Sequence, residues 1–195
     1  MTPKGAVPGD KIIITKGAAI EAAGIFAVAF EEKIRKIFGE DFAKRAEGIF
    51  YKMSVVEDAL TAVSAGVREN GVTSMHDATE CGVWGGLFEV AQASGVGMKV
   101  VKEDIIVLPE VKKICEKFDM DPYTAISEGT LIITAKPHKA GEIVDALKKK
   151  NIDSTIVGEV TGADGLYVIE NGIEKKMAHP RLDPFWPAFS RELGR

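Results

Sequence analysis

The chain has 195 residues, a formal net charge of −4, 46% hydrophobic residues and 28% charged residues. This composition is typical of a folded protein and excludes a chain that is disordered throughout. The acidic balance disfavours a general nucleic-acid binder, which usually carries a basic face, and no basic tract indicates a membrane-surface patch.

The N-terminal part of the chain is predicted to form one strand and three helices. The β-branched run at 11–16 is typical of a buried strand. Apolar residues recur at spacings of three and four over 20–37, which predicts one long helix ended by Gly39. A short helix is expected at 41–51, and a third helix, ended by Asn70-Gly71, follows it.

The middle of the chain alternates extended and helical patterns. An extended segment at 71–76 leads into a loop at 77–82. The apolar stripe that follows predicts a helix closed by Ser94-Gly95, and a strand signal returns at 98–101. A further helix is expected at 109–118, with a proline at its start.

The last third has the clearest pattern. A strand is predicted at 130–135 and a helix at 137–150, whose terminal lysines suit the negative end of the helix dipole. The next strand is 154–160, and Asn171-Gly172 between two short runs is a strong hairpin signal. The hairpin strands are 166–170 and 173–177. The tail, 178–195, is expected to lie against the body as an irregular cover.

These elements are interleaved irregularly and end in a hairpin. Their order argues for an α+β fold, a mixed β-sheet with packed helices, rather than a regular doubly wound sheet. The sequence shows no internal repeat and no linker long enough to separate two domains. We therefore expect residues 1–195 to form a single domain.

Cysteine usage and hydropathy indicate a cytoplasmic protein without a membrane partner. The longest apolar run, 22–30, is too short to span a bilayer, and the first residues lack the layout of a signal peptide. Two cysteines, Cys81 and Cys115, fit a reducing compartment without a disulfide framework. Neither belongs to a C-x-x-C pair and the three histidines are scattered, so no metal site is expected.

One segment has the features of an anion-binding site. Between residues 75 and 86 an extended stretch passes into a helix, with capping residues at the junction and glycines in the first turns. Such a junction leaves backbone N–H groups unpaired at the positive end of the helix dipole, which suits phosphate or another anion. Asp77 is the candidate catalytic residue, since it could cap the helix, position a water or hold a phosphate-bound metal. The candidate phosphate- and substrate-binding residues are His76, Thr79, Glu80, Cys81, Gly82, Gly85 and Gly86.

The glycines and acids of this segment also have a structural interpretation. Glycines near a helix often serve tight packing, so Gly82, Gly85 and Gly86 would admit either a ligand or a second backbone. An aspartate or threonine before a helix is commonly a simple cap. The charges of Asp77 and Glu80 disfavour an anion unless a cation accompanies it.

Three further features leave alternatives open. Cys81 is either a reactive thiol at a helix start or a small packed residue. His76 is an acid, a base, a ligand or a hydrogen-bonded structural residue. Residues 127–130, ahead of a strand, form either a second cleft loop or a plain turn.

Several common catalytic and nucleotide-binding motifs are missing from the sequence. No G-x-x-x-x-G-K-[ST] pattern occurs, which excludes a P-loop. The segment after the first strand does not match G-x-G-x-x-G, and no G-x-S-x-G nucleophile elbow is present.

The run His76-Asp77-Ala78-Thr79-Glu80-Cys81-Gly82, continued through 89–97, resembles a known family. It is similar to the second half of the aminoimidazole ribonucleotide synthetase (AIR synthase) superfamily. The match includes the strand that opens that half, at 9–16, and two later strands, at 128–133 and 157–160. These segments occur in the right order and extend the resemblance over nearly the whole chain. Within the superfamily, the chain most resembles hydrogenase expression/formation protein-like, AIR synthase-related proteins. The resemblance implies the α+β fold of the AIR synthase C-terminal domain.

The resemblance also implies a two-domain, ATP-using enzyme. Its N-terminal domain pairs across a homodimer and holds most of the nucleotide, and its C-terminal domain contributes a glycine-rich loop, 77–86 here. We expect this chain to be the substrate- and phosphate-facing half of a synthetase, kinase or hydrogenase-maturation-like enzyme. The implied substrate is a small phosphorylated or carbamoyl-type molecule. ATP and Mg²⁺ are expected in the intact enzyme, and neither is firmly implied for this chain alone.

The chain departs from the family pattern in three places. The N-terminal ATP-binding half is expected to be absent, because Met1 falls only a few residues before the first strand, so little or no activity is expected from this chain alone. The hydrogenase factor proper ends in a cysteine that carries the modified group, whereas this chain ends in Arg195, which argues against a carbamoyl-dehydrating role. Cys81 stands where the family usually has glycine. The alternative function is a non-catalytic ligand-binding or assembly module that retains the fold.

Loss of the N-terminal half also predicts self-association. A face that meets another domain is partly apolar, and exposed apolar patches of several hundred Å² usually seek another partner. We therefore expect a homodimer formed through the face around the glycine-rich loop, with Trp84 in the patch.

Overall fold

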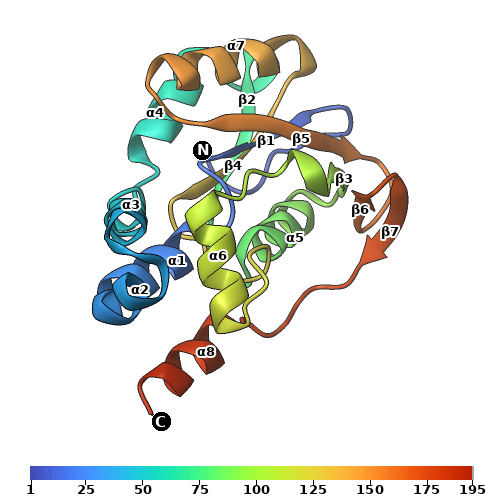
Figure 1. The fold of residues 1–195 in the computed structure, drawn as a ribbon. Helices are drawn as coiled ribbons and strands as arrows, with labels where there is room; N and C mark the ends of the chain where they lie inside the picture. Colours follow the sequence, from blue (N-terminus) through green and yellow to red (C-terminus); the bar gives the residue numbers. More distant parts are fainter. Residues whose placement is uncertain (195) are drawn as a thin grey trace.

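In the computed structural model, which describes residues 1–194, helices pack around one mixed sheet (Figure 1). Across these residues the sheet has seven strands in the order β2-β4-β1-β5-β3-β6-β7. The β3–β6 pair is parallel and the other neighbours are antiparallel. The strands are β1 Lys11–Thr15, β2 Val72–Ala78, β3 Gly97–Val101, β4 Thr130–Ala135, β5 Ser154–Thr161, β6 Leu166–Glu170 and β7 Ile173–Met177. This sheet confirms the expected α+β class; residue 195 of the expected domain and tail lies outside the described residues.

The helices form three groups around the sheet (Figure 1). α5 packs against one sheet face, and α4 and α7 cover the other. The remaining helices gather around Phe26 in a separate cluster. The helices are α1 Ile20–Ala29, α2 Glu31–Phe38, α3 Glu40–Phe50, α4 Val56–Ser64, α5 Gly82–Ser94, α6 Pro109–Phe118, α7 Pro137–Lys149 and α8 Phe185–Glu192.

Alternation along β1 explains why helices lie on both faces of the sheet. Successive side chains of a strand point to opposite faces. Ile12 and Ile14 belong to the core shared with α5, whereas Ile13 belongs to the core shared with α7. All three side chains are fully buried, so β1 is a central strand covered on both sides.

The single helix expected over 20–37 is two helices. Phe30 leaves the helical conformation (φ −122°, ψ 37°), and α2 resumes at Glu31. The Phe30 ring packs against Phe26 and Phe189, with ring centroids 5.2 and 5.3 Å apart. Tertiary packing of an aromatic side chain therefore breaks a helix that periodicity predicts as continuous. The third helix is also shorter than expected, because α4 ends at Ser64 and a 3₁₀ turn follows.

The tail is not irregular throughout, because it contains helix α8. Phe185 and Ala188 are buried against the aromatic cluster around Phe26. The Arg191 guanidinium also donates to the Phe118 carbonyl at 2.9 Å. Pro187 lies in the first turn of α8, where a missing N–H costs no helical hydrogen bond. Proline content suggested an irregular segment, but these positions are compatible with a helix.

Other elements agree with the sequence to within a few residues. Asn171 and Gly172 both have positive φ, 50° and 76°, as a two-residue hairpin turn requires, and β6 pairs with β7 as expected. β2 extends to Ala78, so His76 lies in an extended segment as expected, whereas Asp77 lies in the strand and not in a loop. Within residues 1–194, each helix is too short or too polar to cross a bilayer.

Candidate functional site

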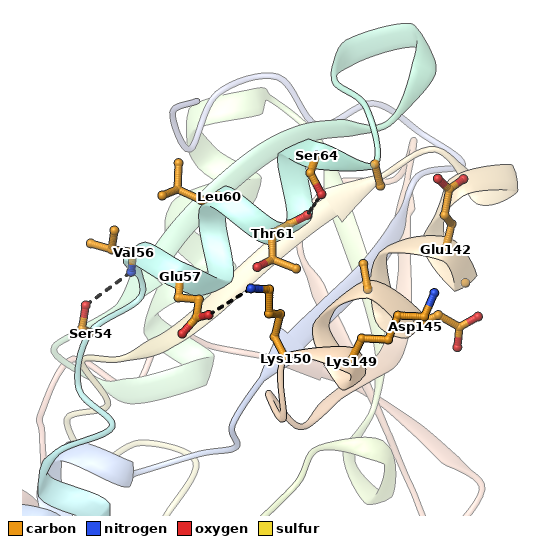
Figure 2. A pocket seen from close by; sticks show the side chains of 13 residues that line it. Ser54, Val56, Glu57, Leu60, Thr61, Ser64, Glu142, Asp145, Lys149 and Lys150 are labelled. Atoms are coloured by element: carbon orange, nitrogen blue, oxygen red, sulfur yellow. Dashed lines mark hydrogen bonds and ion pairs between the residues drawn. The ribbon is translucent and has the colours of Figure 1, made fainter.

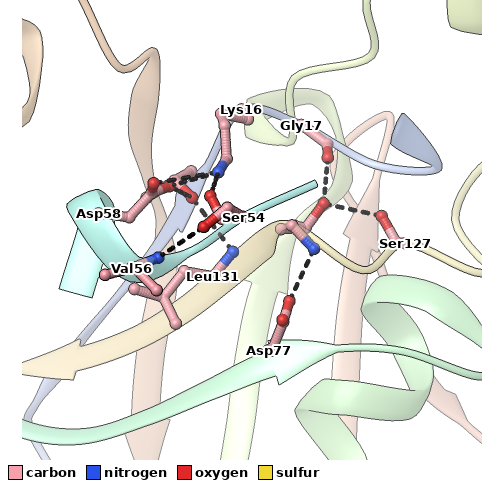
Figure 3. A network of polar contacts seen from close by, with 11 residues as sticks. Lys16, Gly17, Ser54, Val56, Asp58, Asp77, Ser127 and Leu131 are labelled. Atoms are coloured by element: carbon pink, nitrogen blue, oxygen red, sulfur yellow. Dashed lines mark hydrogen bonds and ion pairs between the residues drawn. The ribbon is translucent and has the colours of Figure 1, made fainter. Parts of the chain in front are cut away.

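Asp77 lies where the end of β2 meets the loop that leads into β4. It pairs in register with Leu131, and its carboxylate oxygen Oδ1 accepts the Gly129 N–H at 2.8 Å (Figure 3). Gly129 has a φ of +97°, and a Cβ there would lie 2.5 Å from the Met53 Cα. Only glycine fits this conformation and this close approach, so the loop before β4 is held tightly between Asp77 and Met53.

The Asp77 carboxyl is half-buried and protonates near neutral pH. Burial raises the pKa of Asp77 from 3.8 to about 6, although the Gly129 hydrogen bond acts in the opposite direction. The negative charge of Glu128 adds to the increase. A carboxyl in this state changes its charge in the range in which proton transfer at neutral pH is efficient.

Glu21 is a second carboxylate near Asp77, and the sequence analysis did not identify it. Its Oε2 accepts the Glu128 N–H at 2.8 Å. Burial raises the pKa of Glu21, and the charges of Glu128, Glu80 and Asp77 raise it further. Negative charge is therefore concentrated around Asp77, because carboxylates from α1, from β2 and from the loop before β4 lie near one another.

A buried ion pair lies beside these carboxylates. Lys16 is only 9% exposed, and its ammonium contacts the Asp58 carboxylate at 3.0 Å and donates to the Ser54 carbonyl at 2.8 Å (Figure 3). The Thr15 hydroxyl donates to Asp58 at 2.6 Å. The positive charge of Lys16 lowers the pKa of Asp77, so the ion pair and Asp77 are electrostatically coupled.

Residues 127–130 form the loop before β4, which the sequence analysis left open as a cleft loop or a plain turn. The Thr130 hydroxyl donates to the Gly17 carbonyl at 2.6 Å and bonds to the Ser127 hydroxyl at 2.7 Å (Figure 3). The first bond connects the loop before β4 to the residues that follow β1, and the second lies within the loop. A group of residues assembled by long-range contacts of this kind has no short sequence motif, although the run of Ser127, Glu128 and Gly129 was a partial signal.

The start of α5 differs from the open anion site expected there. The Cys81 N–H donates to the Asp183 carboxylate at 2.7 Å, the Trp84 N–H to the Tyr123 carbonyl at 3.1 Å and the Gly82 N–H to the Thr79 carbonyl at 3.1 Å. Asp77 does not cap the helix, because its carboxylate is turned to Gly129. The expectation of unpaired N–H groups is therefore wrong for these three amides.

The glycines of α5 accommodate the chain's own atoms. A Cβ on Gly82 would lie 2.5 Å from the Ala125 carbonyl oxygen, and one on Gly85 would lie 2.5 Å from the Glu80 carbonyl oxygen. At Gly86 the nearest atom is a methyl group of Ile132, 2.7 Å away. Of the two alternatives, close approach by a second backbone describes Gly82 and Gly85, and packing against a side chain describes Gly86.

Asp183 is a second residue that the sequence analysis missed. It is 9% exposed, and its two carboxylate oxygens accept the N–H groups of Cys81 and Phe185 at 2.7 and 2.9 Å. Burial raises the pKa of Asp183, whereas these backbone hydrogen bonds lower it. The chain thus supplies its own carboxylate to the start of α5. The residue lies 102 positions from Cys81, so no local pattern indicates the contact.

Three residues that the sequence analysis singled out are buried or bonded within the chain: Cys81, His76 and Trp84. Burial raises the pKa of the Cys81 thiol, and nearby carboxylates raise it further, which favours the packed over the reactive interpretation. His76 pairs with Glu89 through Nε2. Trp84 is only 3% exposed and its ring stacks on that of Tyr123 with centroids 5.3 Å apart, so the expectation that Trp84 belongs to an exposed patch is wrong.

Within residues 1–194, the residues around Asp77 form a site for neither a metal ion nor a nucleotide phosphate. Among residues 1–194, no three or more His, Cys, Asp or Glu side chains are arranged to hold a metal ion. The side chain of Glu80 is exposed at the start of α5, where its charge and that of Asp77 repel phosphate. The residues present do not fit the phosphates of ATP by themselves.

Comparison with known proteins identifies the family. The model of "AIR synthase related protein, C-terminal domain" matches residues 7–171. Carbamoyl dehydratase HypE of Rhizobium leguminosarum is 27% identical over 163 residues, which cover 83% of this chain and 43% of that protein. A hydrogenase expression/formation protein of Methanocaldococcus jannaschii is 25% identical over 145 residues, covering 71% and 43%.

Solved structures share the fold. Escherichia coli HypE superposes with a TM-score of 0.74 at 22% identity, covering 94% of this chain and 54% of HypE. Thiamine monophosphate kinase of Aquifex aeolicus superposes with a TM-score of 0.65 at 20% identity, covering 91% and 54%. The chain spans about half the length of the relatives it matches. It belongs to the family of AIR synthase related proteins and has the fold of their C-terminal domain.

Proposed function

We propose that this chain is the substrate-facing half of an ATP-dependent synthetase, kinase or hydrogenase-maturation-like enzyme. Family membership supports the class of enzyme, and relatives about twice as long support a second, N-terminal domain as partner. HypE has been solved in complex with ATP, and a thiamine monophosphate kinase with AMPPCP and TMP. Little activity is expected from this half alone, and the protein is expected to act in the cytoplasm.

The observation that carries the proposal is the half-buried Asp77 carboxyl, which accepts the Gly129 N–H at 2.8 Å and whose pKa burial raises to about 6. A carboxyl with this pKa can accept a proton from a bound substrate or return one to it near pH 7. Asp77 is therefore the proposed proton-transferring group. Glu21 and Glu128 flank it, and Lys16 limits how far its pKa rises.

The cleft favours one substrate type over the other. A phosphate would meet the charges of Asp77, Glu21 and Glu80, and the nearby cation, Lys16, is already paired with Asp58. A carbamoyl amide is neutral, and its N–H groups can donate to carboxylate oxygens. We therefore assign a carbamoyl-type or other amide group to the Asp77 cleft. ATP and Mg²⁺ are assigned to the N-terminal domain.

The alternative is a non-catalytic ligand-binding or assembly module. The pairing of the Cys81, Gly82 and Trp84 amides within the chain favours this alternative, because these three amides of the helix start are not free to bind a ligand. In such a module, ligand binding at the cleft would not depend on the protonation of Asp77.

Amide chemical shifts of the purified chain test the assignment. Ethyl carbamate, as a carbamoyl probe, should shift signals of residues 76–80 and 127–130, and Asp77→Asn should abolish these shifts. Asp164→Asn, a change of an exposed aspartate, is the matched control and should retain them. ATP–Mg²⁺ should leave the start of α5 unshifted and should not be turned over at about 1 s⁻¹ or faster.

The same titrations separate the two functions. Carbamate shifts that weaken as the pH falls through 6 support proton transfer at Asp77. Shifts of equal size at pH 5 and pH 8 would favour the non-catalytic module. Shifts confined to other residues, or ATP shifts at 76–86, would contradict the assignment of the cleft.

A further inference from the structure

The loop before β4 is a β-turn that leaves two backbone N–H groups for other elements. The Thr130 N–H donates to the Ser127 carbonyl at 3.0 Å, and this bond closes the turn. The N–H groups of the two central residues, Glu128 and Gly129, take no part in it. Backbone N–H groups that are shielded from water need an acceptor, and both central amides find one outside the turn.

The two acceptors are carboxylates from different elements. Glu21, in the first turn of α1, accepts the Glu128 N–H through Oε2 at 2.8 Å. Asp77, in β2, accepts the Gly129 N–H through Oδ1 at 2.8 Å (Figure 3). Because the two N–H groups belong to consecutive residues, a movement of the turn that breaks one bond also displaces the other. The orientation of the Asp77 carboxyl therefore depends on how firmly α1 holds the turn.

A second hydrogen bond connects α1 to the same segment. The Ala22 N–H lies at the start of α1, where N–H groups have no helical partner, and it donates to the Ile126 carbonyl at 3.2 Å. The backbone of α1 thus donates to Ile126, and the Glu21 side chain accepts from Glu128. Two bonds at positions two residues apart fix the direction of this segment as well as its position.

The segment that leads into α4 restricts the turn further. A Cβ on Gly129 would lie 2.5 Å from the Met53 Cα and 2.8 Å from the Lys52 carbonyl oxygen. This segment is itself held at the start of α4, where the Val56 N–H donates to the Ser54 hydroxyl oxygen at 3.4 Å (Figure 2). The turn cannot move toward this backbone, so its hydrogen bonds to α1 and β2 resist movement in the remaining directions.

The turn holds one carboxylate oxygen of Asp77 and leaves the other open to a ligand. Among the residues that the structure describes, Oδ1 accepts the Gly129 N–H, whereas Oδ2 accepts no hydrogen bond and is in contact with solvent. A group that transfers a proton must come within hydrogen-bond distance of its substrate. An open Oδ2 on a carboxyl of fixed orientation meets this requirement.

We propose that Glu21 is a positioning residue, which holds the Glu128 amide and thereby fixes the turn that orients the Asp77 carboxyl. This inference rests on the function proposed for Asp77. Glu21 acts through the turn and not by contact with the substrate. The role requires an acceptor oxygen at the reach of a glutamate side chain, and it does not require the negative charge.

Three substitutions separate the reach of Glu21 from its charge. Glu21→Gln keeps an acceptor oxygen at the same reach and removes the charge. Glu21→Asp keeps the charge but is shorter by one methylene group, and Glu21→Ala removes both. Glu103→Ala is the matched control, because Glu103 also accepts a backbone N–H, that of Asn171, at 2.6 Å.

Hydrogen exchange of the Gly129 amide, followed by NMR in the purified chain, measures the effect on the turn. Glu21→Ala and Glu21→Asp should each speed this exchange by ~10-fold or more, because the bond between Gly129 and Asp77 opens more often. Glu21→Gln and Glu103→Ala should leave the exchange rate within about twofold of wild type.

The dissociation constant of ethyl carbamate, obtained from amide shifts of the same variants, measures the effect on the ligand. Glu21→Ala and Glu21→Asp should each raise it by ~10-fold, because the Asp77 carboxyl is no longer held in one orientation. Glu21→Gln and Glu103→Ala should bind as wild type does. A residue that only stabilises the fold would leave the dissociation constant of the folded chain unchanged.

Two results would overturn the proposal. One is an unchanged Gly129 exchange rate in Glu21→Ala. The other is a reversed order, in which Glu21→Asp behaves as wild type and Glu21→Gln does not, because charge would then be the cause. A wild-type chain that binds no carbamate would contradict the proposed function instead, and the Gly129 exchange rates would still decide whether Glu21 positions the turn.

Discussion

The start of α5 and the end of β2 are neighbours, yet they use their polar groups differently. At the start of α5 the amides of Cys81, Gly82 and Trp84 bond within the chain, and the glycines are packed against it. At the end of β2, Asp77 is half-buried beside other carboxylates and has a pKa of about 6. The glycines at the start of α5 therefore serve close packing within the chain. The group whose charge changes near neutral pH is Asp77, at the end of the neighbouring strand β2.

The largest expected loss of stability comes from breaking the buried ion pair between Lys16 and Asp58, which lies beside Asp77. Lys16→Met leaves Asp58 buried without its cation, so the free energy of unfolding should fall by about 3–5 kcal/mol. Lys11→Met removes an exposed ion pair with Glu159 and should cost less than about 1 kcal/mol. Urea unfolding of both variants measures the difference, and equal losses would show that the Lys16–Asp58 pair is not a structural part of the cleft.

The next effect concerns the glycines of the α5 start. Gly82→Ala combines a positive φ of 58° with a contact of 2.5 Å to a carbonyl oxygen, so a loss of about 2–4 kcal/mol is expected. Gly95→Ala has a similar φ of 67° and open space around the new methyl group. Its loss should be about 1 kcal/mol. If thermal or urea unfolding gave the same loss for both, the close approach of Ala125 would not be what requires Gly82.

Asp183 tests whether the α5 start depends on its own carboxylate. Asp183→Ala leaves the buried Cys81 and Phe185 amides without acceptors and should destabilise the fold by about 1–3 kcal/mol. Asp183→Asn keeps an acceptor oxygen and should cost less. Exposed Asp164→Ala serves as the control. Unfolding curves of Asp183→Ala that match those of the control would argue that the helix start is open to a ligand after all.

The smallest effect is the pH dependence at Asp77. Because the pKa of Asp77 is higher in the folded protein than its ordinary 3.8, its protonation stabilises the fold below about pH 4, and this contribution is lost as the pH rises through 6. Asp77→Asn stays neutral, so after allowance for solvent screening it should be more stable than wild type by about 1 kcal/mol at pH 8. The gain should vanish below pH 4. A gain that persists there would indicate a cause other than charge.

Sequence patterns predicted most of the fold, because strands and helix faces produce periodic patterns of apolar residues within short segments. The buried strand β1 and the Asn171-Gly172 turn are examples. Periodicity could not predict the break at Phe30 or the helix α8, because both depend on an aromatic cluster assembled from distant segments.

The same limit applies to the cleft. Asp77 was identified from its motif, and Glu128 lay in a loop with two interpretations. Lys16 and Asp183 could not be predicted, because their partners, Asp58 and Cys81, lie 42 and 102 residues away along the chain. Contacts at that separation become visible only when the sheet order brings the segments together.

The most direct test of the account is the titration of the Asp77 side-chain carboxyl, followed by its ¹³C chemical shift in the purified chain. The account predicts a midpoint at about pH 6, assigned by loss of the signal in Asp77→Asn. A midpoint near 3.8 would contradict it, because Asp77 would then be an ordinary ionised carboxylate with no capacity for proton transfer at neutral pH.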